Sequence, residues 1–201
     1  ETTGTLYEGV SIQNMINMSA GDGDFYGSEE NTIEEYVLPI LVEKKTIKSM
    51  LDATSGLSHL KNANFRYSNI VPDLVARAIH LTSPSGITDY YHKKVANPAN
   101  YSSGMFYFKD KNGWGINFAY LYATREDYLK FAKLVIQDWR SNSCIGSYLR
   151  QIYENRVPTR KMSNGFNHQS YGGFFWMDKE NLSFPHLSMV GHGGQRITVN
   201  L

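Results

Sequence analysis

Tyr171-Gly172-Gly173-Phe174-Phe175-Trp176-Met177 is the stretch that decides the fold, because it predicts a strand rich in aromatic side chains late in the chain. Two shorter segments follow it. Residues 187–190 predict a second strand, and residues 195–201 alternate apolar and polar side chains into a third. The strands of this protein are therefore expected to gather toward the end of the chain.

The residues before this stretch predict helices. The longest, over residues 124–139, has Thr124 at its N-cap and an apolar face that includes Phe131 and Val135. Helices in the middle of the chain and strands late in it, without a repeat or a linker, predict one α+β domain over residues 1–201. The other predicted elements are helices over 10–18 with the cap Ser11, from the cap Thr32 to Pro39, from Thr46 to 53, over 72–81 with Pro72 in the first turn, over 87–95 and over 145–153, a polar loop over 62–69, a strand over 105–108 and a turn over 109–113.

Composition excludes several classes of protein. Twenty basic and nineteen acidic residues leave a net charge of +1, which gives no field that would attract nucleic acid. The single Cys144 excludes an internal disulfide and a cysteine-rich zinc site, and the six histidines lack metal-binding spacing. No apolar run approaches the length that crosses a bilayer, about 20 residues. We therefore expect no nucleic-acid partner, no metal and no membrane span in this chain.

Three local patterns carry functional information. They are Tyr67-Ser68-Asn69 before a helix, Gly191-His192-Gly193-Gly194-Gln195 between two short strands, and Thr124-Arg125-Glu126-Asp127 at the start of the long helix. Each has an ordinary structural explanation: a turn with a buried tyrosine, a tight hairpin with a bystander histidine, and a well-capped helix. Their order and spacing favour a functional interpretation over three coincidences.

These patterns, taken in order, resemble the class C β-lactamase-related family of serine hydrolases, which includes penicillin-binding proteins, esterases and 6-aminohexanoate-dimer (nylon-oligomer) hydrolases. Phe65-Arg66-Tyr67-Ser68-Asn69 is similar to the family's F-x-Y-S-N element. The resemblance extends from residue 10 to residue 195, and His192-Gly193-Gly194 stands where other members have Lys-Thr-Gly. It implies a β-lactamase/transpeptidase-like fold, with an antiparallel sheet flanked by helices. The other matching segments are 10–21, 123–131 (one residue short of the family's spacing) and 171–176.

The chemistry of acyl transfer through a serine gives these residue types roles. The Tyr67 phenol would shuttle the proton, provided that a nearby cation lowers its pKa. The Asn69 amide would donate to the substrate carbonyl. His192 would lie in the cleft near Tyr67 or the leaving group, as a charge that titrates near neutral pH.

The two glycines of the second pattern would shape the site. Gly193 and Gly194 let a strand edge approach the substrate without side-chain bulk, so the Gln195 N–H can form half of an oxyanion hole. The resemblance implies no cofactor, and a small amide or ester as the substrate. It slightly favours a periplasmic or secreted location, which the sequence itself leaves open.

The family's nucleophile, the serine of Ser-x-x-Lys, has no counterpart in the expected place. Only nine residues precede the segment 10–21, and the chain stops within the strand after His192, so we expect a partial domain whose nucleophile lies on a missing segment. Ser58-His59-Leu60-Lys61 matches Ser-x-x-Lys, but it follows the segment 10–21 instead of preceding it. The turn-forming residues around it predict no helix. The alternative is a non-catalytic penicillin-binding-like homologue that binds a peptide or cell-wall ligand.

Overall fold

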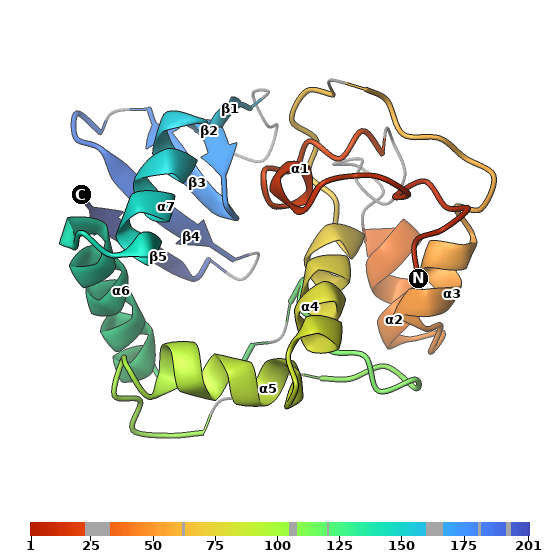
Figure 1. Cartoon of the computed structure of the whole chain (residues 1–201), viewed down its shortest axis with the longest axis horizontal. Coiled ribbons are helices and arrows are strands. Elements are labelled where there is room, and N and C mark those ends of the chain that lie inside the picture. The colour runs from red at the N-terminus through yellow and green to blue at the C-terminus, as the bar shows by residue number, and fades with distance from the viewer. Residues whose placement is uncertain are drawn as a thin grey trace.

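A computed structural model describes residues 1–22, 33–61, 63–104, 108–119, 121–159, 167–180, 182–191 and 194–201. Within these ranges five strands form one antiparallel sheet, in which the strands lie side by side in chain order (Figure 1). The strands predicted over 187–190 and 195–201 are confirmed, while β1 has no counterpart in the prediction. The strands are β1 (Val157–Pro158), β2 (His168–Gly172), β3 (Phe175–Lys179), β4 (His186–Val190) and β5 (Arg196–Asn200).

The single strand predicted over 171–177 is wrong, because the chain reverses within it. Gly173 and Phe174 both have positive φ, 56° and 66°, and Tyr171 pairs with Trp176 across the resulting hairpin. Two-residue turns with positive φ match the twist of the flanking strands. Glycine adopts this conformation at little cost, and the Phe174 N–H is held by the Ile16 carbonyl at 2.9 Å. The continuous aromatic run concealed the turn.

The helical elements come before the sheet in the chain, and most of them lie where the sequence predicts them. The predicted strand over 105–108 falls largely outside the described residues, and the turn after it is confirmed by a hydrogen bond from Gly113 N–H to Asp110 O. The elements are α1 (Ile12–Ile16), the π-helix η1 (Ile33–Val37), α2 (Leu38–Leu41), α3 (Ile47–Asp52), α4 (Ile70–Thr82), α5 (Gly86–Tyr91), the π-helix η2 (His92–Ala96), α6 (Arg125–Arg140) and α7 (Cys144–Glu154).

Helix starts follow the predicted caps Ser11 and Thr124 and the predicted start at Thr46. The side chains of Ser11, Thr46 and Thr124 each accept a backbone N–H three residues on, which satisfies a donor that the helix itself leaves unpaired. One boundary is wrong: the helix expected to end near Pro39 continues to Leu41, because Pro39 lies in the first turn of α2, where its missing N–H costs nothing. Its predicted cap, Thr32, lies outside the described residues.

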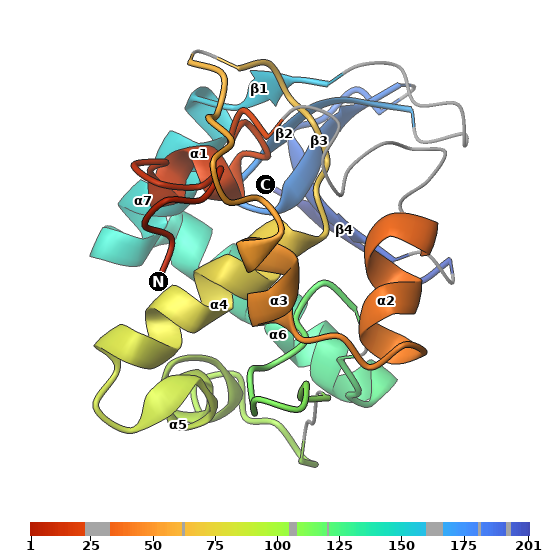
Figure 2. The same cartoon turned by 90° about the vertical axis from the view of Figure 1, so that its right-hand side faces the viewer.

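The sheet separates two apolar clusters. On one face, side chains of α6 and α7 pack against Met177, Leu187 and Val199. Tyr171 and Trp176 belong to the other cluster, which they form with side chains of α1, α3 and α4. Figure 1 shows α6 and α7 beside the sheet and α2 to α4 on the opposite side of the molecule, with α1 between them and the sheet, and Figure 2 shows α3 lying against α4. The second cluster brings the loop before α4 to the sheet.

Candidate active site

Tyr67 lies in the polar loop that leads into α4, and the sheet holds its ring. Trp176 stacks on this ring with the two planes 13° apart and the centroids 5.8 Å apart. Tyr171 meets it edge-on, with 6.3 Å between centroids. Such pairs contribute about 0.5–1.5 kcal/mol beyond the burial of their area. Tyr67 is therefore fixed by two neighbouring strands, although its side chain is only half-buried.

Backbone hydrogen bonds fix the loop itself. The Arg66 N–H donates to the Met18 carbonyl at 2.6 Å, and the Leu60 N–H donates to the Gly21 carbonyl at 2.8 Å. Gly21 has φ +79°, and a side chain there would collide with the backbone of Leu60. Glycine is thus required for the segment 18–22 to run beside the loop that carries Tyr67.

Ser68 and Asn69 follow Tyr67 into the interior. Asn69 is the N-cap residue of α4, but its side chain makes no capping bond. Its side chain is 6% exposed, and its Nδ2 has no acceptor among the described residues. A buried amide donor without a partner costs about 1–3 kcal/mol. The Asn69 amide is therefore available to donate to an acceptor outside the described residues.

A buried carboxylate supports the same loop from the segment 18–22. Asp22 is 4% exposed, and its Oδ2 accepts the Tyr7 hydroxyl at 2.8 Å. Desolvation raises the pKa of this carboxyl above its ordinary value, while the neighbouring Ser68 and Tyr7 hydroxyls act in the opposite direction. Asp22 thus ties the segment 18–22, which runs beside the Tyr67 loop, to Tyr7 near the start of the chain.

The glycine-rich pattern forms the connection between β4 and β5, as predicted. The Gly191 N–H donates to the Gln195 carbonyl at 2.8 Å, and the Gly194 N–H donates to the Gly191 carbonyl at 3.0 Å. Gly194 has φ +84°. Val190, the last residue of β4, packs against the apolar cluster that Tyr67 also contacts.

Two predicted site residues, His192 and Gly193, lie outside the described residues, so the expected position of the histidine stays a prediction. Gln195 is exposed, and its N–H makes no hydrogen bond to another described residue. It is therefore free to serve as the donor that the sequence assigns to it.

Burial raises the pKa of the Tyr67 phenol above its ordinary value of 10.0. Desolvation disfavours the phenolate, and no described cation offsets it. Tyr67 can shuttle a proton only if a nearby cation lowers the pKa of its phenol. None of the described residues supplies that cation, so the role requires a cation from outside them.

Ser58 does not open a helix. Residues 57–60 form neither helix nor strand, and Ser58 is exposed. The expectation that Ser58-His59-Leu60-Lys61 lacks the helical geometry of a nucleophile motif is confirmed. Within the described ranges, no three His, Cys, Asp or Glu side chains converge on a possible metal position. No helix in those ranges has the length and apolarity to cross a membrane.

Comparison of structures finds similar proteins, whereas comparison of sequences finds none. No protein-family model matches the sequence, and no curated protein matches it. The penicillin binding protein from Bacillus halodurans has a similar structure, with a TM-score of 0.60 and 15% identity over 96% of this chain and 69% of that one. D-amino acid amidase from Ochrobactrum anthropi SV3, complexed with D-phenylalanine, has a TM-score of 0.57 and 15% identity over 92% of this chain.

These likenesses establish the fold. The protein has the β-lactamase/transpeptidase-like fold, as the sequence resemblance implied. The chain spans 62% of the length of the amidase structure. Its structural neighbours thus include a penicillin-binding protein and an amidase.

Two features of the site escaped the sequence analysis. Trp176 was a landmark of the resemblance, yet its stacking on Tyr67 joins residues far apart in the chain. The second is the buried His168, whose ring lies beside those of Trp176 and His186 and has no partner for either nitrogen among the described residues. Neither histidine lies in a segment that the sequence predicts as a strand, so no local pattern indicated their burial.

Proposed function

We propose that residues 1–201 form part of a serine-hydrolase domain that cleaves an amide or an ester through an acyl-enzyme. The observation that carries the proposal is the fixation of Tyr67 by Trp176 and Tyr171 at the start of α4. A proton-transfer group must hold its oxygen in one place, and a ring clamped by two aromatic neighbours does so without using its hydroxyl. The fold shared with a penicillin-binding protein and an amidase supports the same class of reaction.

The nucleophilic serine would come from a segment outside these 201 residues. Three observations support this. Ser58 is exposed and outside any helix, the Tyr67 phenol has no described cation to lower its pKa, and the Asn69 amide has no described acceptor. A segment bearing Ser-x-x-Lys would supply the serine, a cation beside Tyr67 and polar atoms for Asn69.

The reaction would then run in two halves. Tyr67, beside the lysine of that segment, would take the serine proton as the oxygen attacks the substrate carbonyl, and would return it to the leaving group. The Gln195 N–H would stabilise the oxyanion, with Gly193 and Gly194 keeping the strand edge clear. His192 would lie near the leaving group. Water would hydrolyse the acyl-enzyme by the same route.

The competing function is ligand binding without chemistry. In that case the protein would be a penicillin-binding-like homologue that holds a peptide or cell-wall ligand, and the unlowered pKa of Tyr67 would be permanent. Both functions use the same loop and the same sheet edge. They differ in whether a reactive serine exists.

A fluorophosphonate probe separates the two, since it labels only activated serines. We expect residues 1–201 to stay unlabelled, and the longest natural form of the protein to carry the adduct on a serine upstream of Glu1. Ester hydrolysis should accompany labelling, and D-phenylalanine amide and linear 6-aminohexanoate amides would test the amide substrates. An adduct mapped to Ser58 would refute the assignment of the nucleophile. A longer form that is neither labelled nor active would refute the hydrolase function.

A further inference from the structure

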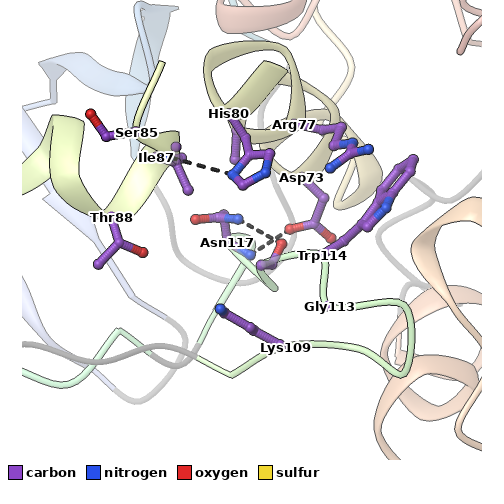
Figure 3. A pocket seen from close by; sticks show the side chains of 13 residues that line it. Asp73, Arg77, His80, Ser85, Ile87, Thr88, Lys109, Gly113, Trp114 and Asn117 are labelled. Atoms are coloured by element: carbon purple, nitrogen blue, oxygen red, sulfur yellow. Dashed lines mark hydrogen bonds between the residues drawn. The ribbon is translucent and has the colours of Figure 1, made fainter. Parts of the chain in front are cut away.

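A pocket of about 190 Å³ lies away from the Tyr67 loop, between α4, the start of α5 and the turn after residue 108. Asp73, Arg77 and His80 enter its wall from one side of α4, since residues spaced by three and four positions share a helix face. Lys109 and Trp114 contribute from the turn (Figure 3). Neither Tyr67 nor Gln195 lines it, so the pocket is distinct from the candidate active site.

The one acid among the described lining residues is already used by the fold. Asp73 is 1% exposed, and its carboxylate accepts the Tyr36 hydroxyl at 2.7 Å and the backbone N–H groups of Asn117 and Phe118. Its role is to hold the segment after Trp114 against α4. Three basic side chains, Arg77, His80 and Lys109, supply nitrogen donors to the wall.

Two of these basic groups are set to donate. The Arg77 guanidinium lies 4.4 Å from the centroid of the Trp114 ring and binds the Glu1 carboxylate through Nε and Nη2, at 3.0 and 2.8 Å. These contacts hold the guanidinium in place and use Nε and Nη2, so Nη1 is the nitrogen left to donate to a ligand, beside a carboxylate that offsets part of the charge. His80 Nδ1 accepts the Ile87 N–H at 3.4 Å, so the neutral ring carries its proton on Nε2, as a donor.

The size and lining of the pocket set the class of ligand. Its volume of about 190 Å³ suits a small ligand. Ala76, Ile87 and Trp114 offer apolar surface, which suits a small organic body rather than a bare inorganic ion. Asp110 near the wall, and the Glu1 carboxylate on Arg77, disfavour a second negative charge on the ligand.

We propose that this pocket binds a small organic monocarboxylate, whose carboxylate lies among Arg77, His80 and Lys109 and whose apolar body lies against Ile87 and Trp114. A carboxylate accepts charge-assisted hydrogen bonds from all three basic groups. Because α4 begins directly after Asn69, the ligand binds to the helix that also positions the candidate active site.

Benzoate tests the proposal, with benzamide as its neutral analogue. The indole N–H of Trp114, assigned by a Trp114→Phe variant, is followed by NMR during titration of the purified protein. We expect benzoate to give a saturable shift at millimolar concentrations, without a comparable shift at Trp139 or Trp176. Benzamide should give no saturable shift. An equal response to both compounds, or no saturation by benzoate, would overturn the proposal.

Two exposed lysines of one turn provide matched variants. Lys109→Met removes a cation from the pocket wall and should weaken benzoate binding by about fivefold, the contribution of one exposed charge-assisted contact. Lys111→Met removes the same charge from a position outside the lining and should leave the affinity unchanged. His80→Gln, at an exposed position, should weaken binding by roughly threefold. Equal losses in the two lysine variants would reduce the effect to general surface charge and refute the site.

Discussion

Tyr67 and Trp176 lie almost parallel, with their ring planes 13° apart, and so the loop before α4 is stacked on the middle strand of the sheet. The Tyr67 hydroxyl takes no part in this contact. Packing of the ring therefore sets the position of the hydroxyl, and the hydroxyl remains available to a group that approaches it. That separation lets the oxygen be removed without disturbing the ring.

Tyr67→Phe tests this separation in the longer form that carries the nucleophile. The ring should keep its stacking, so the melting temperature should change little, while kcat for an ester falls by ~10²–10⁴ with the loss of the proton shuttle. Tyr171→Phe is the matched control, because it removes a second phenol oxygen from the same aromatic cluster. It should retain most of the activity. A Tyr67→Phe enzyme with more than about half the wild-type kcat would remove Tyr67 from the mechanism.

Asp73 should make the stability of the protein depend on pH. Desolvation raises the pKa of this carboxyl from 3.8 to about 7, although the hydrogen bond from Tyr36 and those from the backbone oppose it. Between these values the folded protein binds more protons than the unfolded chain, so stability falls as pH rises from about 4 to 7. Asp73→Asn cannot titrate and keeps an acceptor for the backbone N–H groups of Asn117 and Phe118.

Urea unfolding of both proteins at pH 5 and pH 8 measures this effect. The free energy of unfolding of the wild type, taken relative to Asp73→Asn, should fall between the two pH values by something on the order of 1–4 kcal/mol. Using the difference cancels the titration of other groups. A difference that stays constant with pH would contradict the assignment.

His168 should act in the opposite direction. Burial lowers its pKa from 6.5 to about 4, so the unfolded chain binds the proton first and stability is lost as pH falls through this window. Neither ring nitrogen has a partner among the described residues. His168→Leu should therefore be at least as stable as the wild type at pH 7, and its stability relative to the wild type should rise by about 1–2 kcal/mol between pH 7 and pH 5.

His186 is the control for that substitution. It is equally buried, but its Nε2 accepts the Lys179 N–H at 3.2 Å and its Nδ1 lies 3.0 Å from the Phe184 carbonyl. His186→Leu loses both hydrogen bonds and should be destabilised by about 1–3 kcal/mol at pH 7. If both leucine variants unfold alike at each pH, the absence of partners at His168 has no energetic consequence.

A side chain at position 21 should destabilise the protein, because the Leu60 backbone leaves no room for it. Gly21→Ala combines a positive φ with a collision against the Leu60 backbone, which cannot move aside as a side chain could. Gly9→Ala, at φ +74° with no atom within 4 Å of the new methyl group, isolates the cost of φ alone, about 1–2 kcal/mol. We expect Gly21→Ala to cost at least about 2 kcal/mol more in thermal or urea unfolding. Equal costs would exclude the collision.

The sequence predicts local features better than distant ones, for physical reasons. The caps Ser11 and Thr124 follow from hydrogen bonds that span three residues, so a short pattern contains the whole interaction. The turn at Gly173 and Phe174 also spans few residues, but apolar side chains on both sides conceal it. The order of the strands follows from their closeness along the chain.

The candidate site depends more on contacts between residues that are distant in the chain. The Tyr67-Ser68-Asn69 pattern was found because a known family shares it, yet the stacking of Tyr67 on Trp176 depends on how the sheet packs against α4. The basic pocket on α4 was accessible from spacing, since Asp73, Arg77 and His80 recur on one helix face. It was not predicted, because charged residues on a helix usually form a solvated face.

The contact between α1 and the β2–β3 turn has a consequence for biosynthesis. The side chain of Asn17, at the end of α1, accepts the Gly173 N–H at 3.1 Å, from a residue 156 positions later in the chain. At about 5–20 residues per second, a ribosome takes roughly 8–30 s to make the residues between them. Until then Met15 and Ile16, buried in the finished fold, lack Tyr171 and Trp176 of their apolar cluster, so α1 cannot complete its packing before most of the chain has been made.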